Sequence, residues 1–313
     1  MIILTDCFVQ LALVAVLGYL CVKYFLKRNG EIRKKNLQIK WNTVGKNVVV
    51  LHQFQRARFC PSPSPFVIKL ETFLRLHSIK YVSDFEQPMS DKNKSPWITI
   101  NGENITDSQL AIEYLTKKFQ LDPHPGLTPC EKIVSRGLRF LIEQDLCWVL
   151  RHDRWVLKQG RHLPDYLAPV FPDLPRSVEG WLIANFFSGR IAKQVHAQGM
   201  GRHSYEEIQA MGLQDIQDLS DFLGSKDYMF GKDMPTEIDC VLFGFMCMFL
   251  HCTPKDNVYV QKIVRDCRNL VWHSQRMKEK LWPDWNECLF QDNLERYFFK
   301  WSTLNNFLLN LRK

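Results

Sequence analysis

Four polar side chains in the first third of the chain stand where helices or a strand are predicted to begin, and each can hydrogen-bond a ligand. They are Ser64, Ser95 and the adjacent pair Asp107-Ser108. Ser64 with Pro65 forms a strong signal for the start of a helix, where the positive end of the helix dipole favours a thiolate. A serine hydroxyl cannot exchange disulfides, but it can hydrogen-bond a thiolate and lower the pKa of the thiol. Ordinary helix capping is the alternative role for Ser64.

The stretch 95–109 must position the other three side chains. Residues 97–100 are rich in β-branched and aromatic types and predict a strand, with Pro96 at its start where no ladder hydrogen bond is lost. Asn101-Gly102 is the strongest short signal for a hairpin turn, and the return strand is brief. Residues 106–109 have the Thr-x-x-Gln form of a capping box and predict the start of a helix. Capping is again the alternative to ligand binding at Asp107 and Ser108.

A β-α-β unit precedes that stretch. Residues 47–54 form an apolar run of strand length, which suits a strand buried on both faces. Residues 64–76 predict an amphipathic helix, and residues 80–82 predict a second short strand.

Beyond a Pro- and Gly-rich linker at residues 121–129, the sequence reads as helical. A capping box is predicted at Ser204 with Glu207, and a variant of it at Thr236 with Asp239. The helix after Thr236 is apolar all round, so we expect it to be buried.

One face of that helix carries possible ligands for a soft metal. Cys240, Cys247 and His251 share the face, and Cys252 and Cys267 stand near it in the sequence. The surroundings are strongly apolar, and buried free cysteines commonly act as small hydrophobic residues. We therefore predict no metal site. The ten cysteines contain no CxxC pair and are expected to be reduced.

The net charge of +8 is concentrated near the N-terminus. Residues 1–40 contain seven Lys or Arg and two acids, a net of +5, which leaves +3 for the other 273 residues. This local excess does not indicate a nucleic-acid surface.

Residues 7–26 are almost wholly apolar and just reach the ~20 residues that a spanning helix needs. Asp6 precedes them and no small-residue cleavage site follows, so a cleaved signal peptide is disfavoured. The basic residues that follow place the main domains in the cytosol by the positive-inside rule. The sequence thus predicts a single-pass N-terminal membrane anchor.

Several short segments together resemble one family, the metaxin-related branch of the glutathione-transferase-like superfamily. This branch includes the failed axon connections homologues and the cadmium-responsive proteins of nematodes. The resemblance covers roughly residues 47–285. No single segment is specific for the family, but their combination is. Its segments are Ser64-Pro65-Phe66, Ser95-Pro96-Trp97, Gly199-Met200-Gly201-Arg202, the Thr236–Asp239 cap and Leu281-Trp282-Pro283-Asp284-Trp285.

The resemblance implies an α+β protein with a thioredoxin-like N-terminal domain and an all-α glutathione-transferase-like C-terminal domain. The expected division is an anchor and basic segment at 1–40, the two domains at 41–122 and 123–288, and an amphipathic tail at 289–313.

The resemblance also assigns roles to the polar residues. It implies a cis peptide bond at Pro96, backbone contacts from Ser95 to the cysteinyl part of glutathione, and a γ-glutamyl site at Asp107 and Ser108. The family usually has Glu or Gln at the position of Asp107. Redox relatives read Cys-Pro-Phe/Tyr-Cys where this chain reads Ser64-Pro65-Phe66-Val67. Ser64 is therefore the candidate catalytic residue, of the serine-transferase type.

Two functions follow from the resemblance. The first is a membrane-anchored, non-redox scaffold or interaction protein with a role in axon development. The second is a glutathione-dependent transferase in detoxification or the heavy-metal stress response. The expected partners are a membrane through residues 7–26, glutathione, other proteins and a second copy of the chain, without nucleic acid.

Overall fold

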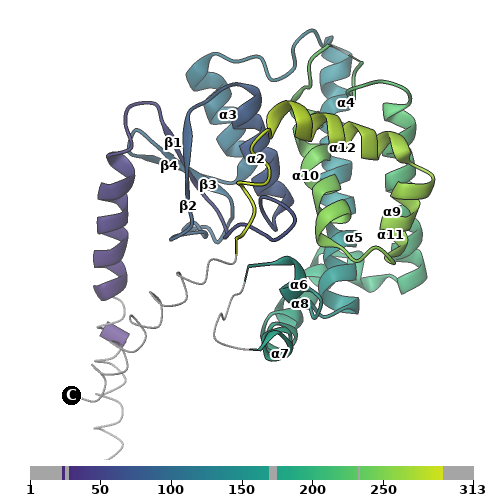
Figure 1. Cartoon of the computed structure of the whole chain (residues 1–313), viewed down its shortest axis with the longest axis horizontal. Helices are drawn as coiled ribbons and strands as arrows, with labels where there is room; N and C mark the ends of the chain where they lie inside the picture. Colours follow the sequence, from purple (N-terminus) through teal and green to yellow (C-terminus); the bar gives the residue numbers. More distant parts are fainter. Residues whose placement is uncertain (1–22, 25–27, 169–174, 232, 292–313) are drawn as a thin grey trace, which may run out of the picture.

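The computed structural model describes residues 23–24, 28–168, 175–231 and 233–291. They form a small domain around a β-sheet and a larger helical domain beside it (Figure 1). The α+β class and the two-domain architecture predicted from the sequence are confirmed.

The sheet has four strands in the order β2-β1-β3-β4. Strand β1 runs parallel to β2 and antiparallel to β3, and β3 pairs with β4 in the predicted hairpin. Its turn residues Asn101 and Gly102 have φ angles of 51° and 85°, which explains the Asn-Gly sequence there. The strands are β1 (Val49–His52), β2 (Tyr81–Asp84), β3 (Trp97–Ile100) and β4 (Glu103–Thr106).

Both faces of the sheet are covered. On one face Val49 and Leu51 join the main core, where α2 (Pro65–Leu76) and α3 (Ser108–Phe119) pack. On the other face a helix at residues 28–42 covers the strands (Figure 1). All four residues of β1 are buried, which confirms the expectation of a strand with two covered faces.

The helix at 28–42 is held by an aromatic stack. The ring of His52 stacks on Trp97 at 3.6 Å between centroids, and Trp41 meets the edge of His52 at 4.3 Å. His52 also bonds Asp84 and Thr99, each at 2.9 Å. Burial lowers the pKa of His52, although the Asp84 carboxylate opposes that shift.

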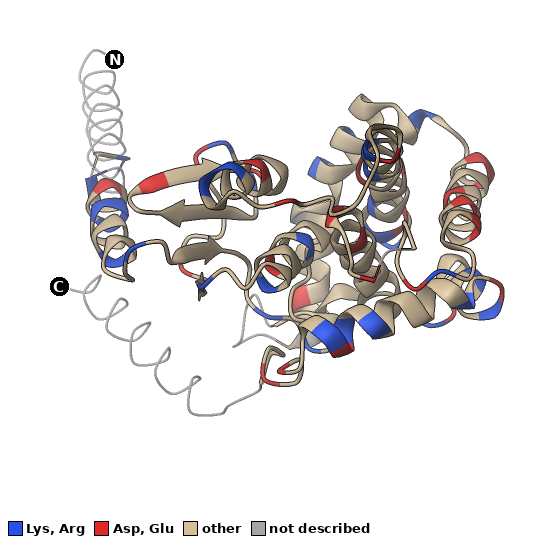
Figure 2. Ribbon diagram, turned by 90° about the horizontal axis from the view of Figure 1, so that it is seen from above, with Lys and Arg blue, Asp and Glu red and all other residues tan. Residues whose placement is uncertain are grey.

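Basic residues of the same helix reach the loop between β2 and β3. Lys34 pairs with Asp91 at 2.6 Å, Lys40 pairs with Glu86, and Arg33 donates to the Glu86 carbonyl. Figure 2 shows Lys and Arg along this helix, on the side of the molecule away from the helical domain. The later part of the basic segment at 1–40 is thus packed against the N-terminal domain.

The helical domain begins with a long, nearly continuous helical segment over residues 129–157. Two stretches within it have π-helical hydrogen bonding, a geometry frequent at functional sites. The segment consists of α4 (Pro129–Phe140), η1 (Leu141–Leu146), α5 (Cys147–Arg151) and η2 (His152–Leu157). The later elements are α6 (Leu163–Tyr166), α7 (Arg176–Phe186), α8 (Ser188–Gln198), η3 (Met200–Arg202), α9 (Tyr205–Leu223), α10 (Glu237–Cys252), α11 (Val258–Arg265) and α12 (Arg268–Leu281).

Two of the predicted capping boxes are confirmed. Both bonds of the box are present at Ser204 with Glu207. At Thr236 the Asp239 carboxylate accepts the backbone N–H at 2.7 Å and the hydroxyl at 2.9 Å. The box predicted at residues 106–109 is wrong. There Asp107 is the N-cap and accepts the N–H of Gln109 at 2.9 Å, because Thr106 still belongs to strand β4.

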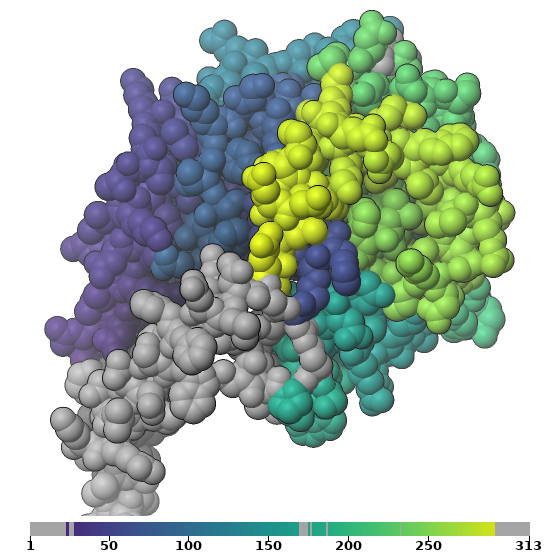
Figure 3. Space-filling view, viewed as in Figure 1, coloured from purple at the N-terminus to yellow at the C-terminus, as the bar shows by residue number. Residues whose placement is uncertain are grey.

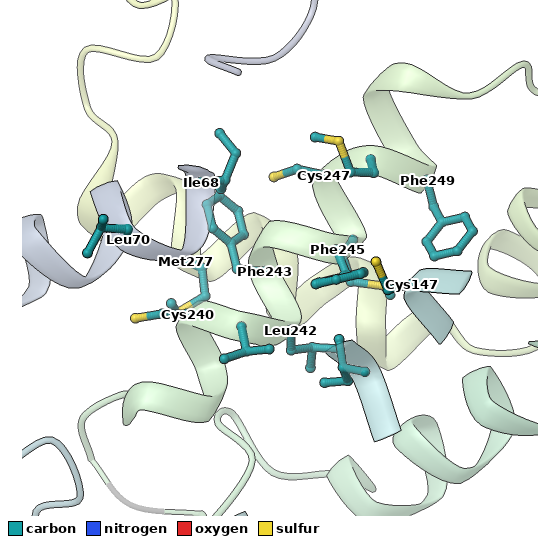
Figure 4. Close-up of a cluster of buried hydrophobic side chains, with 14 of the residues drawn as sticks. Ile68, Leu70, Cys147, Cys240, Leu242, Phe243, Phe245, Cys247, Phe249 and Met277 are labelled. Carbon is teal, nitrogen blue, oxygen red and sulfur yellow. The ribbon is translucent and has the colours of Figure 1, made fainter. Parts of the chain in front are cut away.

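The two domains meet mainly where α2 crosses α10. At Gly244 the backbones approach so closely that a Cβ would lie 2.4 Å from the Pro65 carbonyl oxygen. Apolar side chains from α2, α5, α10 and α12 fill the surrounding core (Figure 4). The predicted burial of α10 is confirmed, since fourteen of its sixteen residues are buried.

Polar contacts reinforce this junction. Lys69, fully buried on α2, bonds Glu143 of η1 at 2.7 Å and Gln109 of α3 at 2.6 Å. After α12 the chain turns back across the domain boundary, where its yellow atoms lie against the N-terminal domain in Figure 3. There Arg75 bonds Asp284 at 2.9 Å.

The predicted membrane anchor at 7–26 lies, except for residues 23 and 24, outside the described residues. Within the part that the structure describes, no helix is both long and apolar enough to cross a membrane. Most of the predicted C-terminal tail, residues 292–313, also lies outside it.

Candidate functional site

A cleft of about 570 Å³ opens between the two domains. Its volume falls within the range of ligand pockets, roughly 300–1,000 Å³. Ser64, Ser95, Asp107 and Ser108 all line it, although they come from three separate segments of the chain. The structure therefore brings these four candidate residues together, whereas Pro96, which follows Ser95, is not among the residues that line the cleft.

Ser64 stands at the N-cap position of α2 but does not cap the helix with its side chain. Its backbone is extended, with φ −114° and ψ 122°, and its hydroxyl accepts no N–H from the first turn. Its carbonyl instead accepts the N–H groups of Val67 and Ile68 at 3.1 and 3.2 Å. Capping therefore does not occupy the Ser64 hydroxyl, and this hydroxyl can hydrogen-bond a ligand in the cleft.

Asp107 has an unusual backbone, with φ 83° and ψ 136°. A positive φ is uncommon for a residue with a side chain, and such conformations cluster at ligand sites. The carboxylate accepts the Gln109 N–H at 2.9 Å and lies 3.5 Å from the ammonium group of Lys94, which also lines the cleft. Asp107 and Ser108 both line the cleft, so the start of α3 borders it.

Ser108 is the first residue of α3 and is 5% exposed. The first N–H groups of a helix have no partner within the helix, and they attract anions. Asp107 already accepts the Gln109 N–H, so a carboxylate at this point would meet the remaining N–H groups and the Ser108 hydroxyl. The Asp107 carboxylate beside it would meet an ammonium group.

Ser95 precedes Pro96, and the peptide bond between them is cis. This agrees with the geometry that the family resemblance implies. The Ser95 hydroxyl is buried without a hydrogen-bond partner among the described residues, although the residue lines the cleft.

The helical domain supplies residues that the sequence analysis did not identify as site residues. Trp148, Arg151, Arg154 and Trp155 line the same cleft from α5 and η2. The Arg151 guanidinium lies 4.7 Å from the centre of the Trp148 ring. Trp148, Arg151 and Trp155 follow one another at three- and four-residue steps, so helical periodicity was the available signal.

Cys60, the thiol nearest to Ser64 in the sequence, is not an exposed nucleophile. It is fully buried, and burial raises its pKa well above the ordinary value, with a further contribution from Cys247. Such a thiol stays protonated and inert.

The candidate metal ligands on α10 do not assemble. Cys240, Cys247, Cys252 and Cys267 are free and buried. Among the residues that the structure describes, no three His, Cys, Asp or Glu side chains are placed to hold a metal ion.

A second hollow, of about 450 Å³, lies at the linker between the domains. Gln109, His124 and Arg136 are among its lining residues. None of the predicted site residues lines it, so the interdomain cleft is the candidate site.

Comparison with known proteins agrees with this geometry. Two family models match the chain, the glutathione S-transferase N-terminal domain over residues 65–160 and the glutathione S-transferase C-terminal domain over residues 212–277. The chain belongs to the glutathione S-transferase-like family.

Relatives of this glutathione S-transferase-like chain include a fly protein and a bacterial enzyme. The chain is 34% identical over 273 residues to Failed axon connections of Drosophila melanogaster, a match that covers 82% of this chain and 63% of the fly protein. The chain therefore spans less than two thirds of that relative. It is 28% identical over 208 residues to the isoprene-epoxide–glutathione S-transferase of Rhodococcus sp. (strain AD45), which covers 63% of this chain and 84% of the enzyme.

The fold is shared with a solved structure. Glutathione transferase GSTFuA3 from Phanerochaete chrysosporium matches with a TM-score of 0.51 at 12% identity, covering 75% of this chain and 98% of that one. At this identity the likeness concerns the fold alone.

Proposed function

We propose that this protein binds glutathione in the interdomain cleft and uses the Ser64 hydroxyl to hold its thiolate. The observation that carries the proposal is the convergence of Ser64, Ser95, Asp107 and Ser108 on one cleft of ligand size. Membership of the glutathione S-transferase-like family supports the choice of ligand.

The γ-glutamyl and cysteinyl parts of the tripeptide have chemical partners in this arrangement. The γ-glutamyl ammonium group faces the Asp107 carboxylate, and the γ-glutamyl carboxylate meets Ser108 and the N-terminal N–H groups of α3. The cysteinyl backbone lies along Ser95. The thiol then reaches the start of α2, where the Ser64 hydroxyl and the helix dipole favour the thiolate.

A thiolate held in this way supports transferase chemistry. The sulfur attacks an electrophilic carbon and forms a C–S bond, while the electron pair of the broken bond leaves with the departing atom, which takes a proton from water. The bound glutathione is the only nucleophile that this reaction requires. Ser64 stabilises the charge on sulfur and needs no redox step.

Calorimetric titration of the full chain with glutathione tests the binding. Saturable binding in the wild type, lost or weakened at least tenfold in Ser108→Ala, is the expected result, since a hydrogen bond to a charged group contributes about 1.5–3 kcal/mol. Ser135→Ala is the matched control, because Ser135 is buried in α4 and lines the linker hollow instead. No heat of binding at millimolar glutathione would refute the proposal and favour a scaffold role.

The role of Ser64 has its own test. The ultraviolet absorbance of the bound thiolate, followed against pH, gives the pKa of the glutathione thiol. We expect Ser64→Ala to raise that pKa by about one unit, the equivalent of one charge-assisted hydrogen bond. An unchanged thiol pKa with unchanged glutathione affinity would remove Ser64 from the chemistry.

We also propose that the protein acts at a membrane, anchored through residues 7–26 with its main domains in the cytosol. The apolar composition of this stretch and the basic residues that follow it support the anchor. Deletion of residues 1–26 is expected to move the protein from the membrane fraction to the supernatant. Unchanged sedimentation would contradict the anchor.

A scaffold function in axon development is the second candidate. The similarity to Failed axon connections favours it. It predicts that the Ser64→Ala and Ser108→Ala variants rescue a loss-of-function phenotype in neurons as well as the wild-type protein does. A transferase function predicts that they do not.

A further inference from the structure

The helix at residues 28–42 carries a stripe of side chains that the rest of the described protein does not cover. The members of this outer stripe follow one another at four- and three-residue steps, which place them on one side of a helix. All of them are exposed, and the two isoleucines are 49% and 57% exposed. The outer stripe consists of Arg28, Ile32, Lys35 and Ile39.

The opposite side of the same helix is fixed to the N-terminal domain. There Leu37 and Trp41 pack against Val50 and Trp97 of the sheet. Three basic residues of the helix also bond the loop between β2 and β3. The domain therefore holds the outer stripe in one direction, on the side of the molecule away from the helical domain (Figure 2).

The charges of the helix are unevenly engaged. Its fifteen residues include five Lys or Arg and a single acid, Glu31. Three of the five cations are held by the loop between β2 and β3. Among the residues that the structure describes, the side chains of Arg28 and Lys35 form no ion pair and no hydrogen bond. The outer stripe thus presents two cations to an external partner, which should be negatively charged.

The composition of the outer stripe fits the surface of an anionic bilayer. Lys and Arg can bury their aliphatic stems while their charged ends meet the lipid headgroups. Ile32 and Ile39 between them add apolar area at the depth of the headgroup boundary. The apolar residues 7–26 precede the helix directly, so the proposed anchor would bring the stripe close to a bilayer. Anionic lipids attract basic residues at this position next to a membrane segment.

Two other occupants fit less well. In a parallel pair of helices from two copies, Arg28 would face Arg28 and Lys35 would face Lys35, and these like charges repel. Residues 292–313 contain four Lys or Arg and two acids, a net of +2, so this tail does not complement a basic stripe. Charge complementarity therefore favours the lipid surface.

We propose that the outer stripe lies on a bilayer that contains anionic lipids, with the helix at 28–42 between the membrane and the sheet. The inference rests on the proposed membrane anchor, because it assigns the lipid surface against which the anchored domain lies. Each Lys or Arg close to such a surface contributes about fivefold to the affinity, and screening by salt weakens the contact.

Photo-crosslinking from the stripe tests the contact in the full chain. Ile39→benzoylphenylalanine is mixed with vesicles of phosphatidylcholine, with or without phosphatidylserine, and illuminated. The matched control is Trp272→benzoylphenylalanine, because Trp272 is 59% exposed on α12 of the helical domain. With phosphatidylserine present, position 39 is expected to give at least tenfold more lipid adduct than position 272. Equal adducts from the two positions would overturn the inference.

Charge reversal tests the role of the two cations. Arg28→Glu combined with Lys35→Glu is expected to lower the lipid adduct at Ile39 at least fivefold. Lys117→Glu combined with Lys132→Glu is the matched control, since both lysines are exposed and lie outside the helix, and it should leave the adduct unchanged. An adduct that survives the reversal of Arg28 and Lys35 would overturn the inference. A crosslink between two protein chains in place of the lipid adduct would also overturn it.

Sedimentation of the full chain separates this inference from the anchor. If the chain stays in the supernatant with phosphatidylcholine vesicles, but sediments with phosphatidylserine vesicles and is released by high salt, the anchor is refuted and the lipid contact of the stripe stands. If the chain sediments with both kinds of vesicle and position 39 gives no lipid adduct, the anchor stands and the inference about the stripe is overturned.

Discussion

Gly244→Ala is expected to separate the first turn of α2 from α10 and so to damage fold and site together. The added Cβ would lie 2.4 Å from the Pro65 carbonyl oxygen and 3.2 Å from the Lys69 nitrogen. Both atoms belong to the backbone, so no side chain can swing away. The helices must move apart by roughly 1 Å to reach an ordinary contact distance.

The magnitude follows from two opposing effects. Overpacking a tight core costs about 1–3 kcal/mol, whereas replacing glycine by alanine inside a helix gains about 1 kcal/mol. Because the clash involves rigid backbone, we take the upper end and expect a net loss of about 2 kcal/mol. Ser64 moves with the first turn of α2, so the glutathione affinity should fall about tenfold or more as well.

Urea unfolding followed by circular dichroism measures the stability change, and titration with glutathione measures the affinity. Gly137→Ala is the matched control, since Gly137 lies in α4 with nothing within 4 Å of an added Cβ. It should stabilise the protein by up to about 1 kcal/mol. If Gly244→Ala and Gly137→Ala shift the urea midpoint by the same amount in the same direction, the reasoning about the crossing of α2 and α10 is refuted.

Three further predictions concern buried groups. Burial, with help from nearby acids, raises the pKa of Asp215 to about 7, so its neutral form stabilises the fold below pH 4 and this stability is lost as pH rises to 7. Between pH 5 and pH 8 this group should lower the free energy of unfolding of the wild type by on the order of 3 kcal/mol, as measured by urea unfolding, and Asp215→Asn should remove that decrease. An equal decrease in the wild type and the variant would contradict the prediction. Lys69→Met removes the nearer of two cations from the buried Glu143, at 2.7 Å, and leaves Arg139 at 3.4 Å. It should cost about 3 kcal/mol, much of it recovered by adding Glu143→Leu, and an unrecovered double variant would argue against the pair. Trp41→Ala should lower the free energy of unfolding by about 3 kcal/mol, measured by thermal unfolding. Ile39→Ala, at an exposed position of the same helix, should change it little. Similar effects of the two substitutions would mean that the helix at 28–42 is not held through Trp41.

The parts of the fold that the sequence predicted are local. The Asn101-Gly102 turn and the Thr236–Asp239 capping box depend on backbone and side chains within four residues, so residue type alone specifies them. The cap of α3 was misplaced by one residue because Thr106 and Asp107 are both good caps, and the length of β4 decided between them. The family resemblance also led to the four candidate residues around the cleft.

The sequence by itself determined local features, such as the Asn101-Gly102 turn and the helix starts at Ser64, Ser204 and Thr236. Only the tertiary structure decided that the Ser64 hydroxyl does not cap α2, that Trp41 covers the second face of the sheet against His52, and that Trp148 and Arg154 of the helical domain line the same cleft as Ser64. The physical reason is distance along the chain. Capping and turn energies act between near neighbours, whereas burial and charge pairing depend on groups from remote segments that folding brings together.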